Sequence, residues 1–358
     1  MKITMVGYTI PQSNINGASR GIARYIYYTG SELVKMGHDV NLFVRDDVKP
    51  PEKWIKTISA PKVSWIPYPM FVYKKIRGVR SDVFHADYVN TGAPLIWAKK
   101  RPAVVAIHDV LPFSYDKKDL TVMDKVRVAF YMRNFKSIEK ADAIILASEC
   151  ARNEAIEKTR IPEEKIHAVH YGIDSEMLKP APPKNHDKIR IGYIGGLDGR
   201  KNVTLLIECF KKISRGNKNV ELHLAGTGRN FEKFEEMEIP NMFLHGDVKY
   251  KDVPSFLNSL DVFVFPTLGE GFGLPVCEAM ACGVPVVASN VSTMPEIVGD
   301  SGILSDPTVA DMSESIERLV VDKNLRRKIG KRGLERSKEF TWKKAAEKTV
   351  GIYEEVMK

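Results

Sequence analysis

Cysteine is scarce in this sequence: its 358 residues include only four, and no two of them form a C-x-x-C pair. Zinc sites and disulfide-rich secreted domains both depend on closely spaced cysteines, so the sequence predicts neither. Cys277 and Cys282 fall on one expected helix rather than across a loop. We therefore expect all four cysteines to be buried, reduced thiols.

Long hydrophobic runs are also missing. The apolar start, Ile3 to Ile10, is interrupted by Gly7 and closed by Pro11, which makes it too short for a secretory signal with its cleavage site. Elsewhere the sequence has no run of about eighteen apolar residues that could cross a bilayer. These absences predict a cytoplasmic protein, either free or at the inner surface of the membrane.

The composition is that of an ordinary globular protein, with 44% hydrophobic and 28% charged residues. A chain of this length exceeds what one hydrophobic core usually serves, so two domains are expected. The clearest boundary is the segment KPAPPK at 179–184, where three prolines exclude a helix interior or a central strand. The predicted ranges are 1–184 for the first domain, 185–340 for the second and 341–358 for a C-terminal helix.

Positive charge is unevenly distributed. The net charge of +9 lies entirely within residues 1–184, while residues 185–358 hold equal numbers of acidic and basic side chains. Basic groups such as 74–77, 99–101 and 117–118 form either an ordinary solvated face or a contact with anionic lipid headgroups or a polyprenyl phosphate. Nucleic acid is not expected as a partner, because these groups are not interleaved with a stacking platform or a binding motif.

Residues 262–289 predict a strand, a glycine turn, a helix and a second strand in succession. The apolar run VFVFP at 262–266 is typical of a buried parallel strand. Pro275 suits the first turn of the helix, and Gly283 lies where that helix would end.

The turn of this unit predicts an anion site. The amides of Phe272, Gly273 and Leu274 would lie at the positive end of a helix dipole, where phosphate binds readily. Glu270 precedes the turn, at the carboxyl end of the strand, and Glu278 lies about one turn into the helix. Because two carboxylates touching a phosphate would repel it, each is expected to accept hydrogen bonds from neutral hydroxyls, such as those of a sugar.

A second strand–glycine–helix unit runs from the strand at 189–194 through GGLDGRKN at 195–202. Arg200 and Lys201 stand at the expected helix start, where cations are unfavourable to the dipole unless an anion lies between them. Arginine clamps phosphate in a bidentate manner and lysine supplies a point charge, so the pair predicts a diphosphate site. Two solvated surface cations are the alternative.

The first domain begins with a strand at 3–7, a polar loop and a helix at about 20–36. This is the first unit of a doubly wound domain. The loop carries Gly17 and Gly21, which do not fit the G-x-G-x-x-G fingerprint and so do not favour a dinucleotide site. Simple turn chemistry is the plain alternative for both.

A later apolar strand is expected at 103–107, and His108 and Asp109 follow at its carboxyl end. In open sheets, functional groups usually lie at this end of the strands. The plain alternative is a strand-end histidine with Asp109 capping the loop. His85 follows another short apolar run and is expected to be a satisfied loop histidine, because nothing nearby gives it a catalytic partner.

Several of these motifs resemble those of one enzyme family. The string EGFGLPVCEAMACGVPVV at 270–287, with seven residues between its two glutamates, resembles the E-x7-E signature of retaining glycosyltransferases of family four. NGASRGIARY at 16–25 resembles the glycine loop of that family, and IHDVLP at 107–112 resembles its histidine motif. The resemblance implies the α/β GT-B fold, with two Rossmann-like, doubly wound domains facing a central cleft and a C-terminal helix that crosses back to the first.

The resemblance also implies a reaction, the transfer of a hexose with retention from a nucleotide diphosphate sugar to a glycan or polyprenyl-linked acceptor. The expected catalytic residues are Glu270 and His108, which contacts the donor sugar in relatives. Glu278 is expected to hold ribose hydroxyls, and backbone groups at Val248 are expected to contact the nucleobase. One departure is Gly196, where many members carry arginine. The expected donor-binding residues are Gly17, Arg200, Lys201, Val248, Phe272, Gly273, Leu274 and Glu278.

The identity of the donor stays open at this point. The motif details resemble mannosyltransferases that use GDP-mannose, but enzymes that use UDP-glucose share nearly all of them. No cofactor is expected, and because the sequence has no D-x-D motif, no divalent metal is expected either. The alternatives are a GT-B sugar-nucleotide epimerase, a phosphorylase and an inactive partner subunit of a glycosyltransferase. The phosphorylase lacks support, because no pyridoxal-bearing lysine region is found.

Overall fold

A computed structural model of the chain describes residues 1–11, 20–45, 52–59, 68–110, 121–182, 187–197 and 199–358. They form two compact units. Unit 1 comprises Met1–Gly172 together with Trp342–Lys358, and unit 2 comprises Ile173–Thr341. The described part of the proline segment lies in unit 2, where the Ala181 N–H donates to Asn258 Oδ1 at 2.8 Å.

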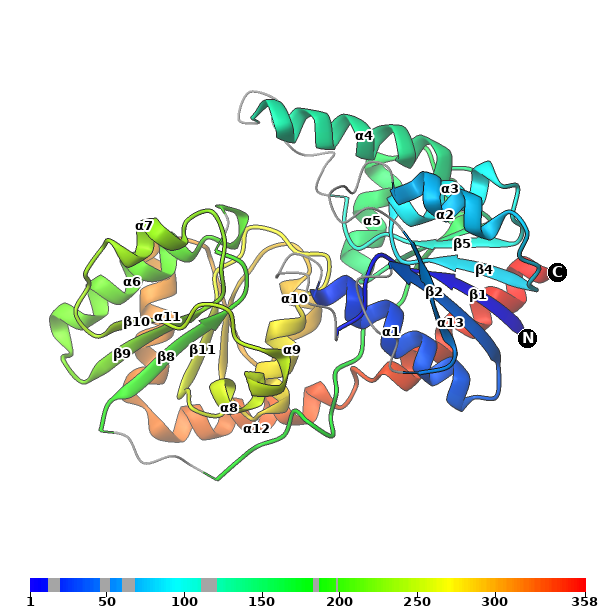
Figure 1. The fold of residues 1–358 in the computed structure, drawn as a ribbon. Helices are drawn as coiled ribbons and strands as arrows, with labels where there is room; N and C mark the ends of the chain where they lie inside the picture. Colours follow the sequence, from blue (N-terminus) through cyan, green and yellow to red (C-terminus); the bar gives the residue numbers. More distant parts are fainter. Residues whose placement is uncertain (12–19, 46–51, 60–67, 111–120, 183–186, 198) are drawn as a thin grey trace. The chain divides into compact units, whose positions relative to one another are not determined.

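Unit 1 is built on a seven-stranded parallel sheet with the order β3-β2-β1-β4-β5-β6-β7 (Figure 1). The sequences of β4, β5 and β6 are short and buried throughout, as expected for parallel strands covered on both faces. The strand order reverses between β1 and β4, which makes a topological switch point at their carboxyl ends. The strands are β1 (Lys2–Val6), β2 (Asp39–Arg45), β3 (Ile55–Ile58), β4 (Val83–Ala86), β5 (Ala103–Ala106), β6 (Ala143–Leu146) and β7 (Ile166–Ala168).

Six helices accompany this sheet in the described part of unit 1. The last of them, α13, comes after the whole of unit 2 in sequence and packs against α1, with the Trp342 ring stacked on Tyr28 at 5.4 Å. The helices are α1 (Arg20–Lys35), α2 (Tyr68–Ile76), α3 (Val89–Trp97), α4 (Val122–Ile138), α5 (Glu149–Lys158) and α13 (Trp342–Met357).

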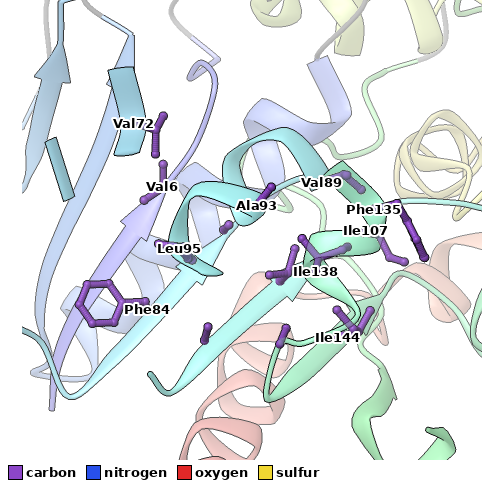
Figure 2. Close-up of a cluster of buried hydrophobic side chains, with 14 of the residues drawn as sticks. Val6, Val72, Phe84, Val89, Ala93, Leu95, Ile107, Phe135, Ile138 and Ile144 are labelled. Carbon is purple, nitrogen blue, oxygen red and sulfur yellow. The ribbon is translucent and has the colours of Figure 1, made fainter. Parts of the chain in front are cut away.

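The core of unit 1 lies between the sheet and the helices α2, α3 and α4. Figure 2 shows Phe84 on β4, Ala93 on α3 and Phe135 and Ile138 on α4 within one cluster of buried side chains. Gly92 on α3 permits this packing, because a Cβ there would lie 2.7 Å from a Val105 methyl group. Burial of this apolar surface stabilises the packing of these helices against one face of the sheet.

Unit 2 repeats the design with a six-stranded parallel sheet in the order β10-β9-β8-β11-β12-β13. The switch point lies between β8 and β11, the two strands that precede the motifs singled out in the sequence. The expected α/β class with two Rossmann-like units is therefore confirmed. The strands are β8 (Ile189–Ile194), β9 (Val220–Ala225), β10 (Met242–Leu244), β11 (Val262–Phe265), β12 (Val286–Ser289) and β13 (Ile303–Ser305).

The helices of unit 2 follow the expected strand–turn–helix order. In α9, Pro275 occupies the first turn and Gly283 follows the end, as predicted. The helices are α6 (Val203–Gly216), α7 (Phe231–Glu235), α8 (Val253–Leu257), α9 (Leu274–Ala281), α10 (Met294–Val298), α11 (Val309–Val321) and α12 (Lys323–Ser337), with the 3-10 turns η3 (Gly199–Lys201) before α6 and η4 (Tyr250–Asp252) before α8.

Candidate active site

The switch point of unit 2 brings three charged side chains into contact. Arg200 and Lys201 lie on η3, after β8, and Glu270 lies in the loop after the neighbouring strand β11. The Glu270 carboxylate forms an ion pair with the Lys201 ammonium through Oε1 and lies 3.2 Å from Arg200 Nη1 through Oε2. The side chain of Glu270 is only 9% exposed, whereas that of Arg200 is 37% exposed. The anion that the sequence predicts between the two cations is, in this structure, Glu270 itself.

Backbone hydrogen bonds fasten the loop 267–270 to Arg200. The Leu268 N–H donates to the Arg200 carbonyl at 2.9 Å, and Arg200 Nη1 donates to the Gly269 carbonyl at 2.7 Å. The Thr267 hydroxyl accepts from the Gly269 N–H at 3.3 Å and lies 3.4 Å from Glu270 Oε1. The two motifs, which are about seventy residues apart in sequence, therefore form one constrained constellation.

Ser292 holds the backbone of Glu270 from the other side. Its hydroxyl accepts a hydrogen bond from the Glu270 N–H at 3.2 Å and donates one to the Glu270 carbonyl at 3.0 Å. Ser292 has a φ of +54°, an uncommon conformation for a residue other than glycine. Sequence reasoning missed this residue, because a serine in the loop after β12 gives no signal of its partner in the loop after β11.

The ion pairs decide the charge of Glu270. Burial acts to raise the pKa of this carboxyl, but the charges of Lys201 and Arg200 and their hydrogen bonds outweigh burial and hold the pKa below its usual range. Glu270 is therefore ionised at neutral pH, and it lies beside two cations.

The start of α9 lies next to this cluster in the chain. Gly273 caps the helix with a φ of +97°, and a Cβ there would lie 2.5 Å from the Met294 methyl group. The expected need for glycine is confirmed. Phe272 is buried with its ring against Phe340 at 5.6 Å. Leu274 is the first residue of the helix, so the three amides expected to bind an anion belong to the residue before the cap, to the cap and to the first turn.

Glu278 lies in the middle of α9 and is 2% exposed. A carboxylate buried to this extent is costly unless it is paired, which is consistent with a defined role, although the assignment to ribose hydroxyls stays a prediction.

Three loops at the carboxyl ends of β8, β9 and β10 contact one another. The Leu197 N–H donates to the Thr227 carbonyl at 3.1 Å, and the Gly226 N–H donates to the Gly246 carbonyl at 2.6 Å. Val248, expected to contact a nucleobase, follows Gly246 in this row of loops and is half-buried. Gly17, the remaining expected donor-binding residue, lies outside the residues that the structure describes.

In unit 1, both ring nitrogens of His108 are engaged. Its Nε2 lies 2.6 Å from the Asp87 carbonyl, and its Nδ1 is hydrogen bonded to the Tyr171 hydroxyl. Because a carbonyl can only accept, Nε2 carries the proton, and the Tyr171 hydroxyl donates to Nδ1. Burial lowers the pKa of His108 to about 4, although its hydrogen bond to Asp87 acts in the opposite direction. A contact between this imidazole and a sugar hydroxyl, as predicted, would have to share or replace one of these partners.

Tyrosine rings enclose the imidazole of His108. The Tyr88 ring stacks on it with the two ring centroids 6.0 Å apart. The rings of Tyr25 and Tyr171 approach it edge-on, with centroid distances of 5.6 and 5.8 Å. Burial raises the pKa of Tyr25 and Tyr171 well above the usual tyrosine value. The expected strand-end position of His108 is confirmed, and aromatic rings surround it.

Asp87 lies beside His108 at the end of β4, and sequence reasoning missed it. Its carboxylate accepts hydrogen bonds from the Thr91 hydroxyl at 2.8 Å and from the Tyr8 N–H at 3.2 Å. Burial raises its pKa to about 7, and these hydrogen bonds oppose the shift.

His85 is satisfied, as expected, but it lies within β4 rather than in a loop. It is hydrogen bonded to Tyr25 at 3.1 Å and to Tyr353 of α13 at 2.5 Å. The strand extends further than the sequence suggested, because all four residues of β4 are covered on both faces.

Several basic side chains of unit 1 have intramolecular partners. Lys100 donates to the carbonyls of Arg77 and Val79 at 3.0 and 2.6 Å, and Arg101 pairs with Asp142. The group 117–118 lies outside the described residues. In the part of the chain that is described, no helix combines the length and apolarity that a membrane span requires, and no three His, Cys, Asp or Glu side chains are grouped to hold a metal ion. Membrane contact and cytoplasmic location stay predictions.

Two family models match the chain, one for each half. The model described as Glycosyltransferase Family 4 matches residues 19–177, and the model described as Glycosyl transferases group 1 matches residues 174–336. Between them they span residues 19–336, which include His108, Arg200, Lys201, Glu270 and Glu278, while β1 and α13 of unit 1 lie outside both matches.

Two curated relatives are mannosyltransferases of Escherichia coli. The chain is 28% identical to O-antigen chain mannosyltransferase B over 296 residues, which are 75% of this chain and 74% of that protein. It is 26% identical to the serotype-specific mannosyltransferase WbdA over 263 residues, which are 68% of this chain but only 32% of that protein.

Two solved structures share the fold over nearly the whole chain. Sucrose-phosphate synthase from Thermosynechococcus elongatus superimposes with a TM-score of 0.83 at 19% identity and covers 99% of both chains. HepE from Anabaena, in complex with UDP and glucose, superimposes with a TM-score of 0.74 at 17% identity and covers 98% of this chain and 99% of its own. At these identities the likeness concerns the fold.

Proposed function

We propose that this chain, which belongs to the family-four glycosyltransferases, transfers a mannosyl residue with retention from GDP-mannose to a glycan or polyprenyl-linked acceptor. That it is a hexosyltransferase follows from its family; the donor, the stereochemistry and the acceptor are what we add. The observation that carries the proposal is the contact of Glu270 with Arg200 and Lys201 at the switch point of unit 2.

The charges of this cluster suit the bond that must break. Cleavage between the sugar and the diphosphate develops negative charge on the departing phosphate, and preorganised donors aimed at that charge are usually the largest catalytic contribution. Arg200 and Lys201 supply two cations on a constrained turn. The amides of Phe272, Gly273 and Leu274 at the start of α9 supply the second set of donors.

The sugar itself becomes electron-poor in the same step. An ionised carboxylate beside the ring stabilises that positive character, and fixed hydroxyl contacts hold the ring in place. Glu270 is ionised because of its two cations, so it fits this role without first losing a proton. In a retaining reaction at the front face, the leaving phosphate accepts the proton of the acceptor hydroxyl, and Glu270 need not form a covalent bond.

The remaining assignments extend the same site. Glu278, four residues after Leu274 on α9, is proposed to accept hydrogen bonds from ribose hydroxyls. The backbone at Val248 is proposed to contact the nucleobase. His108 is proposed to act on the donor sugar as a neutral hydrogen-bonding group, since its pKa of about 4 excludes a charged role at neutral pH. The reaction is proposed to need no metal, because Arg200 and Lys201 neutralise the diphosphate directly.

Mannose as the transferred sugar is supported by the two relatives of E. coli named as mannosyltransferases. The competing donor is UDP-glucose, whose enzymes share most of the same motifs. A thermal shift series with GDP, UDP and ADP separates the two, because a ligand at about 100 times its dissociation constant stabilises a protein by roughly 2.7 kcal/mol.

The decisive test is transfer itself. Purified protein is incubated with GDP-mannose, UDP-glucose and ADP-glucose and a panel of glycan and polyprenyl-phosphate acceptors, and products are followed by mass spectrometry and by NMR of the anomeric proton. We expect an α-mannosyl product, formed equally well with EDTA. Hydrolysis or epimerisation of the donor without transfer, an inverted product, or activity that returns only with added magnesium would contradict the corresponding part of the proposal.

A further inference from the structure

Glu270 occupies the same two cations that a diphosphate would use. Its Oε2 lies 3.2 Å from Arg200 Nη1, and its Oε1 is paired with Lys201. A phosphate group that binds both cations must approach these nitrogens to hydrogen-bond distance. The carboxylate and the phosphate would then lie against each other.

We propose that the Glu270 carboxylate and the diphosphate of the donor compete for Arg200 and Lys201, so that donor binding exchanges one anion for the other and frees Glu270 to face the sugar. This inference rests on the proposed function and adds to it the order of events at its site.

Charge balance favours exchange over simultaneous contact. Two cations and one carboxylate leave one positive charge, whereas a nucleotide sugar brings two negative charges on its diphosphate. If Glu270 stayed in place, its ionised oxygens would repel the incoming phosphate at a distance where two like charges interact strongly in a partly buried site. Rotation of the carboxylate away from the cations removes this repulsion and leaves the phosphate with both partners.

The exchange requires a change in the side-chain conformation of Glu270 alone, because its backbone is held in place. Ser292 binds both the N–H and the carbonyl of Glu270, and Arg200 binds the carbonyl of Gly269. The loop is therefore fixed, and the flexible part is the glutamate side chain with its three rotatable bonds. The cations in turn are held ready, because the turn that carries Arg200 is tied to Leu268.

The pairing also keeps the cations ordered before a donor arrives. Two neighbouring cations at the start of a helix repel each other and oppose the helix dipole. The carboxylate offsets both effects, and the lowered pKa of Glu270 reports the strength of its pairing. Exchange therefore replaces an internal anion with a better-matched external one, at a site that stays assembled throughout.

Exchange predicts a change in nucleotide affinity, on removal of Glu270, that is opposite in sign to the change expected for an ordinary binding residue. If Glu270 only assisted donor binding, its removal would weaken the binding of a nucleoside diphosphate or leave it unchanged. If Glu270 competes for the cations, Glu270→Gln removes the competitor, and the nucleoside diphosphate binds more tightly although sugar transfer is lost.

Isothermal titration of the whole chain with GDP, UDP and ADP tests this. For the nucleotide that the unsubstituted protein binds, we expect Glu270→Gln to lower the dissociation constant at least tenfold, which corresponds to about 1.4 kcal/mol. The matched control is Glu221→Gln, which removes the same charge from a carboxylate paired with Arg190 at 3.2 Å, at the opposite end of the strands. Its dissociation constant should stay within about twofold of the original, well inside the 1.4 kcal/mol that a tenfold change represents.

A second variant keeps the test valid if Glu270→Gln folds poorly. Thermal unfolding measured without nucleotide shows whether each variant is folded. Glu270→Asp keeps the charge but has a shorter reach, so it too should bind the nucleotide more tightly, by less than Glu270→Gln. Unchanged or weaker binding by a folded variant overturns the exchange and leaves the proposed function standing. If the unsubstituted protein binds none of the three nucleotides, the proposed function is overturned, and the exchange with it.

Discussion

The two units share one architecture but place opposite chemistry at the ends of their strands. In unit 1, His108 is neutral and enclosed by tyrosines. In unit 2, Glu270 lies between two cations. The net charges show the opposite distribution: residues 1–184 carry the whole net charge of +9, and residues 185–358 have a net charge of zero. The excess of charge in a domain therefore does not locate a site; the placement of single charges at a switch point does.

The largest effect should follow from removing one cation of unit 2. Lys201→Met keeps the length of the side chain and its packing over Phe265, but it removes a charge aimed at the leaving phosphate. We expect turnover to fall about 10²–10³-fold, as for other single donors of this kind. Steady-state kinetics with the donor that supports transfer in the assay described above measures the loss. Lys188→Met, which removes a cation paired with Glu221 in the same unit, should retain activity, and equal losses in both variants would contradict a local role.

The next effect should come from Ser292, which holds Glu270 without belonging to the charged cluster. Ser292→Ala removes both hydrogen bonds to the Glu270 backbone, so the carboxylate is less well oriented. We expect kcat to fall about tenfold with little change in KM, the pattern of a lost contribution in the transition state.

Two further variants separate positioning by Ser292 from a merely structural role. Ser292→Thr keeps the hydroxyl and should recover most of the activity. Ser214→Ala, which removes a serine hydroxyl from α6, should change neither constant. A rise in KM alone for Ser292→Ala would show that the residue acts on substrate binding instead.

A smaller effect is expected in unit 1 from Tyr171→Phe. The variant removes the hydroxyl that donates to His108 Nδ1 and leaves a buried acceptor without its partner. The free energy of unfolding should fall by about 1–3 kcal/mol. Nitrogen NMR of the imidazole should show a changed Nδ1 signal while the proton stays on Nε2, because the Asp87 carbonyl still accepts from it. An unchanged Nδ1 signal together with unchanged stability would contradict the hydrogen-bond assignment.

The subtlest test concerns pH, to which Asp87 and Glu270 should contribute with opposite signs. The raised pKa of Asp87, about 7, means that this carboxyl keeps its proton in folded unit 1 where the unfolded chain has lost it, so its contribution to stability is lost as pH rises from about 4 to about 7. The lowered pKa values of His85 and His108, about 3 and about 4, oppose it in the same unit, because the unfolded chain binds protons there that the folded unit does not. The lowered pKa of Glu270 gives unit 2 a contribution that is complete above about pH 4.3 and is lost as pH falls through the folded value.

Hydrogen exchange resolved by peptide, corrected for the intrinsic pH dependence, separates these two responses. Compared with the unsubstituted protein, Asp87→Asn should make the stability of unit 1 rise more steeply with pH and leave unit 2 unchanged. Glu270→Gln should make the rise in unit 2 shallower and leave unit 1 unchanged. Changes of slope with the same sign in the two variants would refute the contrast.

Much of the fold could be predicted from the sequence, because its signals are local. Runs such as VFVFP and AVVAI are apolar without alternation, which predicts strands covered on both faces. Gly273 could be assigned to a turn because its left-handed conformation excludes most other residues. The unfavourable position of Arg200 and Lys201 at a helix start predicted an anion between them, and an anionic side chain lies there.

The partners of the site residues could not be predicted in the same way. Ser292 binds Glu270, and Tyr171 binds His108, across more than twenty residues of intervening chain in each case. Such contacts depend on the order of strands in the sheet, which a single sequence does not specify. The sequence pointed to an external phosphate for Arg200 and Lys201 because it could not reveal that β8 and β11 are neighbours.

Helix α13 has a consequence for biosynthesis. It is translated only after the whole of unit 2, yet it supplies the hydroxyl of Tyr353 to His85 and packs against α1 near the start of the chain. On the ribosome, the earlier-made unit must therefore wait for the later one, although domains usually fold in the order of their synthesis. Until α13 is made, the side of α1 that it covers stays exposed, and transiently exposed apolar surface is prone to aggregation.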